Sequence, residues 1–253
     1  MPTFEEQVAE AAAAPVDGWD FSWLDGRASE ERPSWGYARL LVRRIADARA
    51  VLDIQTGGGE VLAEVLAQLP VRPSLVAATE SWPPNLARAR RNLKDLDVTV
   101  QDAQDDGDLP FPAATFDLVV SRHPTVTVWP EIARILRPGG TYLSQQVGPG
   151  SNRELTDFMM GPQPVGEGRN PRRAVALAEA AGLRVLGLRE ETVRAEFHDV
   201  GAVVYFLRKV PWTVPGFTVD GYREQLRRMH DHMADQGPFV TSVTRFLIEA
   251  GKP

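Results

Sequence analysis

The chain has 253 residues, carries a formal net charge of −6 and contains no cysteine. A chain of this length can bury a substantial core without a metal or disulfide staple. The lack of cysteine excludes thiolate nucleophiles, disulfide frameworks and Cys-based zinc sites, and it fits a reducing compartment. The negative charge repels phosphate backbones, so the composition argues against a nucleic-acid partner.

The first residues predict a short helix or a frayed arm rather than a secretion signal. Residues 1–14 contain an alanine run, but Glu5, Glu6 and Glu10 stand where a signal peptide would carry basic residues. Elsewhere, Arg, Asp or Pro interrupts every apolar stretch before it reaches the ~20 residues that a membrane helix needs. We therefore expect a cytoplasmic protein without a membrane partner.

From about residue 50 onward, apolar runs of strand length alternate with segments of helical period. Strands are predicted at 50–54, 74–79, 98–100, 116–120 and 141–147, and helices at 60–69, 85–96 and 128–136. This alternation is typical of βαβ units and of a largely parallel sheet.

The second half of the chain is less regular. Residues 148–171 are rich in Gly, Pro and polar side chains and predict a long loop, which in a compact domain is more often a lid than an idle connection. Helices are expected at 172–181, 199–208 and 220–236, with strands at 184–189 and 240–250. Together the elements predict a doubly wound, mostly parallel seven-stranded sheet with helices on both faces.

Residues 51–60 place a strand, a glycine-rich turn and a helix start in immediate succession. Glycines let the backbone turn sharply and approach a ligand, and the N–H groups at a helix start are free donors, so a nucleotide-like ligand is expected there. A dinucleotide fingerprint needs G-x-G-x-x-G/A, and after Gly57 and Gly59 its last position is Leu62, which disfavours a pyrophosphate loop. Asp53, inside the strand, is costly to bury unless a cation or N–H donors face it.

Acidic side chains follow the next two predicted strands. Glu80 ends the second strand about 20 residues beyond the turn, where a carboxylate can accept hydrogen bonds from both ribose hydroxyls. Asp102 follows the third strand. Open α/β sheets bind ligands at the carboxyl ends of their strands. We therefore expect one crevice to hold the ribose, the base and the remaining tail of the nucleotide-like ligand.

In these residues the chain resembles the class I methyltransferases that use S-adenosylmethionine (SAM), particularly the group with the methyltransferase type 11 domain. The resemblance covers about residues 51–147 and has five parts. They are the Asp53-x-x-x-Gly57-x-Gly59 turn, Glu80, Asp102-Ala103, the run Leu109-Pro110-Phe111-Pro112 with Phe116-Asp117-Leu118-Val119, and Leu136-Arg137-Pro138-Gly139-Gly140. Gln55 departs from the pattern, because family members often have glycine there.

The resemblance implies SAM as the cofactor and assigns a part of it to each strand end. Asp53 and the backbone of Gly57 and Gly59 would flank the methionine portion, Glu80 would bind the ribose, Asp102 and Ala103 would meet the adenine, and Ser121 and Arg122, with His123, would lie under the sulfonium end. Gln55 and Thr56, in the same turn, complete the expected cofactor-binding set.

His123 is the candidate catalytic residue, because it lies just beyond the fourth predicted strand and a near-neutral pKa suits a general base. The alternative is that this histidine, which precedes Pro124, caps a turn or shapes the pocket wall. His230 and His232 are two residues apart on a predicted helix and do not share a face, so no metal site is expected.

Substrate contacts are expected from segments outside the strand-helix units. The candidates are Trp35 and Tyr37 in the aromatic region before the first strand, and His198, Tyr205 and Trp212 in the C-terminal part. Core packing of the aromatic residues, and helix capping by Asp199 beside His198, are the competing readings. On this interpretation residues 1–45 form a lid, and residues 46–253 form the SAM-binding domain, with loop 148–171 and insert 198–236 as a cap.

The preferred function is methyl transfer to an oxygen or nitrogen of a small-molecule acceptor. The second possible enzyme is an rRNA or tRNA methyltransferase, which would need a basic surface that the composition does not indicate. A SAM-binding protein without catalysis is the third possibility. The sequence indicates neither the acceptor nor the oligomeric state.

Overall fold

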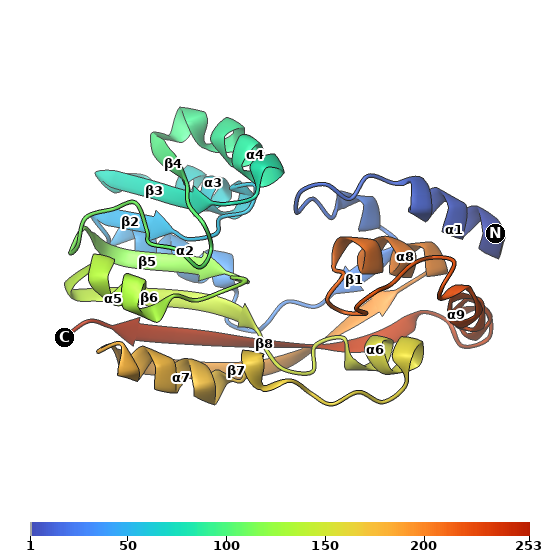
Figure 1. Cartoon of the computed structure of the whole chain (residues 1–253). Coiled ribbons are helices and arrows are strands. Elements are labelled where there is room, and N and C mark those ends of the chain that lie inside the picture. Colours follow the sequence, from blue (N-terminus) through green and yellow to red (C-terminus); the bar gives the residue numbers. More distant parts are fainter. Residues whose placement is uncertain (1) are drawn as a thin grey trace. The chain divides into compact units, whose positions relative to one another are not determined.

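The computed structural model describes residues 2–253, which form eight strands and nine α-helices in the order shown in Figure 1. The strands are β1 (Ala28–Glu30), β2 (Ala50–Asp53), β3 (Leu75–Glu80), β4 (Val98–Asp102), β5 (Phe116–Arg122), β6 (Leu136–Val147), β7 (Arg184–Phe197) and β8 (Phe239–Gly251). The helices are α1 (Phe4–Ala13), α2 (Tyr37–Ala46), α3 (Glu60–Ala67), α4 (Pro83–Leu93), α5 (Trp129–Ile135), α6 (Arg153–Met160), α7 (Pro171–Ala180), α8 (Val200–Lys209) and α9 (Arg223–Gln236).

The strand order is β1-β7-β8-β6-β5-β2-β3-β4. Strands β2 to β6 pair in parallel, and β8 pairs with β6 in the antiparallel direction. The alternation of strands and helices in the sequence therefore gave the right class, a doubly wound α/β fold. By internal contacts the chain divides into two compact units.

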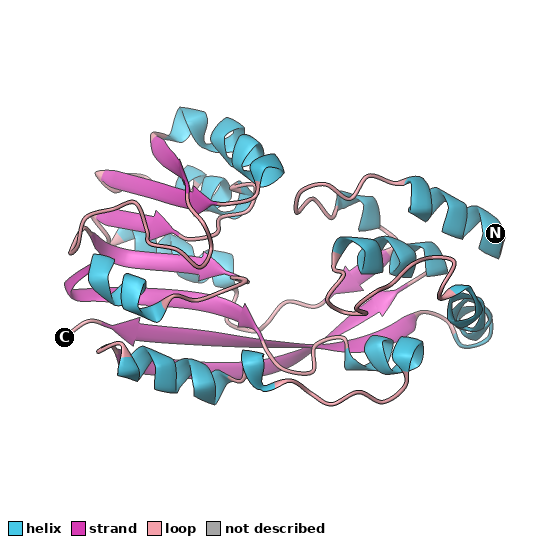
Figure 2. Cartoon of the chain, in the orientation of Figure 1, coloured by secondary structure: helices cyan, strands magenta, loops and turns pink. Residues whose placement is uncertain are grey.

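The sheet unit consists of residues 33–148, 167–191 and 245–253. Successive side chains of a strand point to opposite faces, and the two cores follow that alternation. On one face, Val51, Val120 and Leu143 pack against α2, α3 and α4. On the other, Leu52 and Val119 pack with α5 and α7. Helices thus cover both faces of this sheet (Figure 2), which is why its central strands β2 and β5 are mainly apolar and mostly buried.

The helical unit consists of the residues up to Arg32, with 149–166 and 192–244. Helices α1, α6, α8 and α9 enclose its apolar core, in which Val8, Leu155, Val203 and Leu226 are buried. Strand β1 pairs with the end of β7, from Ala28 opposite Phe197 onward. Three distant stretches of sequence therefore build one compact body.

Two elements differ from the sequence-based expectation. The sheet has eight strands rather than the predicted seven. The additional strand is β1, whose sequence Ala-Ser-Glu lacks the apolar alternation from which a strand is predicted. Residues 148–171 are not a continuous loop, since α6 lies within them. Leu155 and Met159 are spaced four residues apart and are both buried, but the flanking Gly and Pro residues conceal this short amphipathic pattern. The predicted lid over 1–45 stays a prediction; by contacts, the units divide after Arg32.

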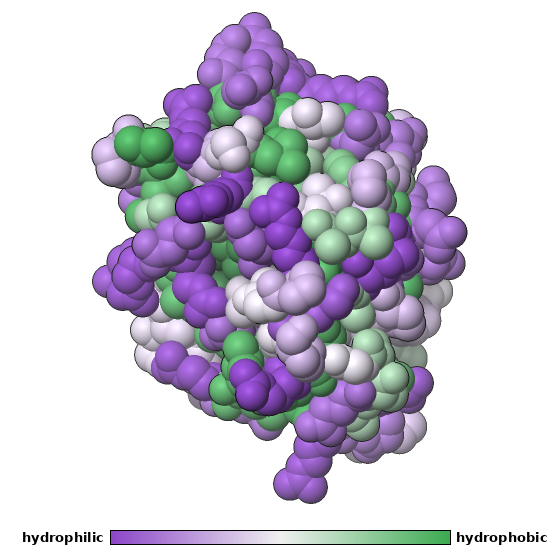
Figure 3. Space-filling model, turned by 90° about the vertical axis from the view of Figure 1, so that its left-hand side faces the viewer, coloured by the Kyte–Doolittle hydropathy of each residue, from purple (hydrophilic) through white to green (hydrophobic). Residues whose placement is uncertain are grey.

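The amino-terminal edge of the parallel strands carries mainly hydrophilic side chains with scattered apolar ones (Figure 3). Leu75, which begins β3, is one such apolar residue and is 38% exposed. Single exposed apolar side chains are common on protein surfaces and need no ligand to explain them. None of the helices within residues 2–253 has the length and apolarity that crossing a membrane requires.

Candidate functional site at the carboxyl edge of the sheet

The glycine-rich turn after β2 adopts a left-handed backbone at three positions, with φ of 56° at Gln55, 65° at Gly57 and 78° at Gly59. Glycine is required for different reasons at Gly57 and Gly59. A Cβ on Gly59 would lie 2.8 Å from a Leu93 methyl carbon, so glycine lets α3 pack closely on α4. A Cβ on Gly57 would meet nothing within 4 Å, so the backbone there borders open space from which a ligand can approach.

Glu80 connects this turn to the end of β3. Its side chain is buried, and its carboxylate accepts hydrogen bonds from the backbone N–H groups of Gly57 at 2.8 Å, Ser81 at 3.1 Å and Trp82 at 2.9 Å. Burial raises the pKa of Glu80, while these N–H donors act in the opposite direction. The residue predicted to bind ribose therefore also fixes the position of the glycine-rich turn.

Asp53 is the carboxyl group beside the turn whose pKa is most strongly shifted. It is 9% exposed and accepts a 2.6 Å hydrogen bond from the Thr56 hydroxyl. Burial raises the pKa of Asp53 to about 7; the Thr56 hydrogen bond and the Arg122 charge lower it, and the Glu80 charge raises it further. A cation placed beside Asp53 would favour its ionised form.

Because of this shift, the contribution of Asp53 to the unfolding free energy of the ligand-free protein is expected to fall as the pH rises from 3.8 to about 7. In that window folded Asp53 keeps a proton that the unfolded chain releases, so the folded state binds more protons and loses stability with rising pH. Urea unfolding at about pH 5 and about pH 8 measures the slope. Asp53→Asn should reduce it and the exposed Asp95→Asn should not; an unchanged slope in Asp53→Asn would contradict the assignment.

Gln55 occupies a position where the resembling family often has glycine, and its side chain binds the loop that follows β5. The amide oxygen accepts from the backbone N–H of Thr125 at 2.6 Å, and the amide nitrogen donates to the carbonyl of Val126 at 2.7 Å. These bonds offset part of the cost of a left-handed backbone at a non-glycine residue. Gln55 thereby joins the strand ends of β2 and β5.

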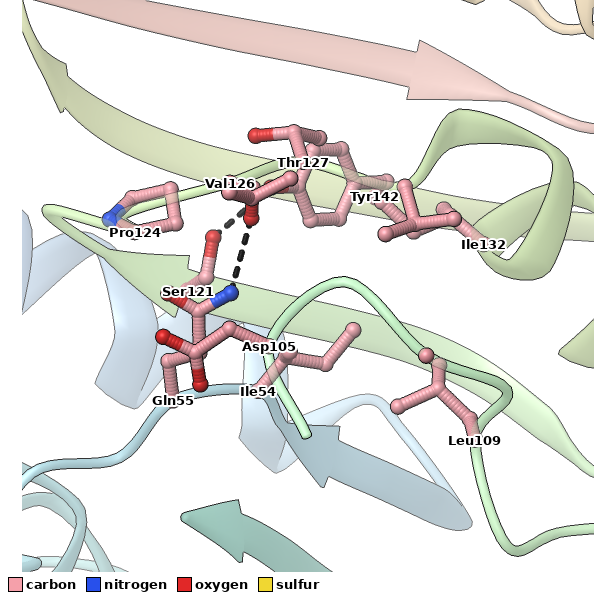
Figure 4. Close-up of a pocket in the computed structure, with 12 residues that line it drawn as sticks. Ile54, Gln55, Asp105, Leu109, Ser121, Pro124, Val126, Thr127, Ile132 and Tyr142 are labelled. Carbon is pink, nitrogen blue, oxygen red and sulfur yellow. Dashed lines mark hydrogen bonds between the residues drawn. The ribbon is translucent and has the colours of Figure 1, made fainter. Parts of the chain in front are cut away.

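Asp105 extends these connections to β3 and β4. Its carboxylate accepts from the Thr125 hydroxyl at 2.5 Å and from the Ser81 hydroxyl at 2.8 Å. Beneath these contacts lies a small pocket with apolar walls that include Ile54, Leu109 and Tyr142 (Figure 4). Asp105 was not among the residues expected from the sequence, because its partners come from other strand ends.

Asp102 and Ala103 lie beside Glu80, as the topology requires. Asp102 is opposite Glu80 in the β3–β4 register, and the Ala103 N–H donates to the Glu80 carbonyl at 3.4 Å. Asp102 is exposed and Ala103 is partly exposed. Their contact with adenine stays a prediction.

Ser121 and Tyr37 are buried within the sheet unit. The Ser121 hydroxyl bonds to the hydroxyls of Tyr142 at 2.7 Å and Ser144 at 2.8 Å, and the Tyr37 hydroxyl donates to the Ser121 carbonyl at 2.8 Å. Burial raises the pKa of Tyr37. The two residues join α2 to the end of β5, and neither hydroxyl is free of a protein partner.

His123 follows β5 with a left-handed backbone, φ 55°, and its ring bonds to the side chain of Gln145 on β6. The Trp35 indole N–H donates to Oε1 of Gln145 at 2.7 Å, and Nε2 of Gln145 lies 2.9 Å from Nε2 of His123. Because the indole can only donate, it fixes the Gln145 amide with its oxygen toward Trp35 and its NH2 toward the histidine. His123 must then accept at Nε2 and carry its proton on Nδ1.

The surroundings of His123 also keep it neutral. Burial lowers its pKa well below the ordinary value, and the charges of Arg122, Arg245 and Arg169 lower it further. A base that accepts through Nε2 would first have to displace Gln145. The proposed general-base role stays a prediction, and the geometry favours a neutral donor. The adjacent glutamines Gln145 and Gln146 near the end of a predicted strand were the available sequence signal for this network.

The remaining substrate candidates lie in the helical unit. The Nδ1 atom of His198 is 3.2 Å from the Gly26 carbonyl, the Tyr205 ring stacks on Trp23 at 4.6 Å, and Trp212 is 49% exposed. Asp199 caps α8 by accepting a hydrogen bond from the Ala202 N–H at 2.8 Å. Helix capping was the alternative to substrate contact in this region. Substrate binding by these residues, and by Trp35 and Tyr37, stays a prediction.

Comparison with known proteins identifies part of this architecture. The family described as methyltransferase domain matches residues 51–140, from β2 through the start of β6. The matched segment contains the glycine-rich turn, Glu80, Asp102 and His123. The residues around His123 and Ser121 that lie outside it are Trp35, Tyr37, Tyr142, Ser144, Gln145, Arg169 and Arg245.

Solved structures similar to this chain share the class I methyltransferase fold. A candidate methyltransferase from Bacillus halodurans C-125 has a TM-score of 0.59 at 17% identity, covering 86% of this chain and all of that one. Phosphoethanolamine N-methyltransferase 2 of Haemonchus contortus, solved with phosphomonomethylethanolamine and S-adenosylhomocysteine, has a TM-score of 0.54 at 16% identity, covering 100% of this chain and 61% of that one.

The same fold also supports chemistry other than methyl transfer. The [4+2]-cyclase SpnF is similar with a TM-score of 0.50 at 17% identity, covering 98% of this chain and 91% of the cyclase. Curated proteins give no match to the chain. The methyltransferase-domain assignment therefore rests on the family match, and the structural similarities establish the fold.

Proposed function

We propose that the protein transfers a methyl group from SAM to an oxygen or nitrogen of a small-molecule acceptor. The observation that carries the proposal is the link between the glycine-rich turn and Glu80, through the 2.8 Å bond from the Gly57 N–H. It arranges an open backbone segment, an acidic strand end and the buried Asp53 at the edge where this fold binds its ligands.

The residues present fit SAM. Gly57 leaves space for close approach of a ligand, and Asp53, whose pKa is raised by burial, gains from a neighbouring cation such as the ammonium group of the methionine portion. The Glu80 carboxylate has more acceptor capacity than its three N–H donors use, so it can also receive a ribose hydroxyl. SAM would supply an activated methyl group and its leaving group.

The protein's contribution on this proposal is to orient the acceptor and exclude water. Positioning alone lowers the barrier of a displacement reaction substantially, so a strong base is not required. His123 is neutral and bonded through Nε2 to Gln145, which is consistent with a reaction that needs no strong base. A net charge of −6 favours a small-molecule acceptor over RNA.

Isothermal calorimetry tests the cofactor directly. We expect S-adenosylhomocysteine to bind and NAD not to compete, because Leu62 replaces the third glycine of a dinucleotide fingerprint. Transfer of label from methyl-labelled SAM to a panel of small metabolites then separates an enzyme from a SAM-binding protein. Tight NAD binding without a SAM signal would refute the proposal. Salt-sensitive methylation of RNA would show that the acceptor is RNA and not a small molecule.

A further inference from the structure

Arg122, Gln145 and Arg245 share one face of the sheet, where β5 and β6 end beside the middle of β8. Arg122 lies opposite Gln145 in the β5–β6 register, and Gln145 lies opposite Leu247 on β8. Arg245 is two residues before Leu247 and therefore projects from the same face. Because His123 bonds to the Gln145 side chain, its ring lies among these residues.

Arg122 brings positive charge to this location without a bonded acidic partner in the described residues. Within residues 2–253, no hydrogen bond or ion pair engages the guanidinium of the exposed Arg122; Asp53 is the carboxyl group whose pKa its charge affects. Burial alone lowers the pKa of Arg169, and no carboxylate opposes it. The charges of Arg122, Arg169 and Arg245 all act on His123, and no carboxylate acts in the opposite direction.

The hydrogen-bond pattern leaves His123 with one donor to offer. Trp35 and Gln145 together occupy its Nε2 atom, and so Nδ1 carries the proton. In the described part of the chain no acceptor bonds to this Nδ1–H. A neutral donor beside the unbonded guanidinium of Arg122 suits an anionic group, because charge-assisted hydrogen bonds to carboxylate and phosphate oxygens are strong.

We propose that Arg122 and the Nδ1–H of His123 bind a carboxylate or phosphate group of the methyl acceptor. Arg245 and Arg169 add positive potential without having to contact the anion, and Trp35 and Gln145 are positioning residues that hold His123 in its donor form. This assignment rests on the proposed function, which it deepens by naming the acceptor as an anionic small molecule.

The same chemistry could come from the carboxylate of the cofactor itself, so the test separates the two sources. Protein labelled with ¹⁵N-histidine is titrated with inorganic phosphate and with acetate, before and after saturation with S-adenosylhomocysteine. Tautomer-sensitive NMR follows His123 among the four histidines of the chain. Sodium chloride at equal ionic strength controls for screening.

We expect a saturable shift of His123 Nδ1 that persists in the S-adenosylhomocysteine complex. Arg122→Gln should weaken anion binding ~10-fold, whereas Arg90→Gln, which removes an exposed charge from α4, should leave it unchanged. No shift, or an equal shift with chloride, would overturn the anion site. A shift that S-adenosylhomocysteine abolishes would overturn its assignment to the acceptor.

The labelled-SAM panel provides an independent readout. Compounds that accept the methyl group are expected to carry a carboxylate or phosphate, and their neutral amide or ester analogues should react far less well. Neutral acceptors that react equally well would refute the inference and leave the methyltransferase proposal intact. Failure of S-adenosylhomocysteine to bind would instead contradict the proposed function, while the anion titration of the ligand-free protein would still report on the site.

Discussion

Replacing Glu80 by alanine is expected to weaken S-adenosylhomocysteine binding by roughly 1.5–3 kcal/mol, because charge-assisted hydrogen bonds to the ribose are lost. Calorimetry measures this change directly. The same substitution should lower the unfolding free energy by about 1–3 kcal/mol, since the N–H groups of Gly57, Ser81 and Trp82 lose their acceptor.

Two variants separate the effects of the Glu80 charge from those of its hydrogen bonds. Glu80→Gln keeps an oxygen acceptor for the turn and should spare most of the stability while still reducing affinity. Glu64→Ala removes an exposed carboxylate from α3 and should alter neither quantity by more than about 0.5 kcal/mol. A folded Glu80→Ala protein with unchanged affinity would remove Glu80 from the cofactor site.

Replacing Trp35 by alanine is expected to lower the unfolding free energy by about 3–5 kcal/mol, because a large buried side chain is deleted from the core. Trp35 is 7% exposed and packs in the same cluster as Leu41, Val120 and Leu143. Denaturant unfolding checks the value. The exposed Trp212→Ala serves as the matched control, and its cost should be about 1 kcal/mol or less.

Trp35→Phe tests the positioning role while keeping most of the ring volume. Without the indole N–H, the Gln145 amide is free to rotate, so His123 is expected to populate both neutral tautomers. The ¹⁵N spectrum of the histidine ring reports this directly, and a purely packing role for Trp35 would leave it unchanged. A wild-type tautomer in folded Trp35→Phe would show that another contact fixes the amide.

The local sequence was sufficient for the fold class and for the first acidic residues of the site. Strand and helix periods are read over a few neighbouring residues, so β2 to β6 and the helices between them are visible without tertiary information. Parallel strands share a carboxyl edge, so Asp53, Glu80 and Asp102 could be brought together from topology alone. The glycine spacing distinguished this turn from a dinucleotide loop.

Tertiary structure decided the contacts between residues far apart in the chain. Trp35 meets Gln145 across 110 positions, and Gln55 meets Thr125 across 70, so no local pattern could reveal that these polar groups hold His123 and the loop after β5. The same limit concealed β1, whose three residues form a strand through pairing with β7, and the assembly of three separate segments around α8. Periodicity shows which face of an element is apolar. The partner that covers that face, or satisfies a buried amide, is determined when the whole chain packs.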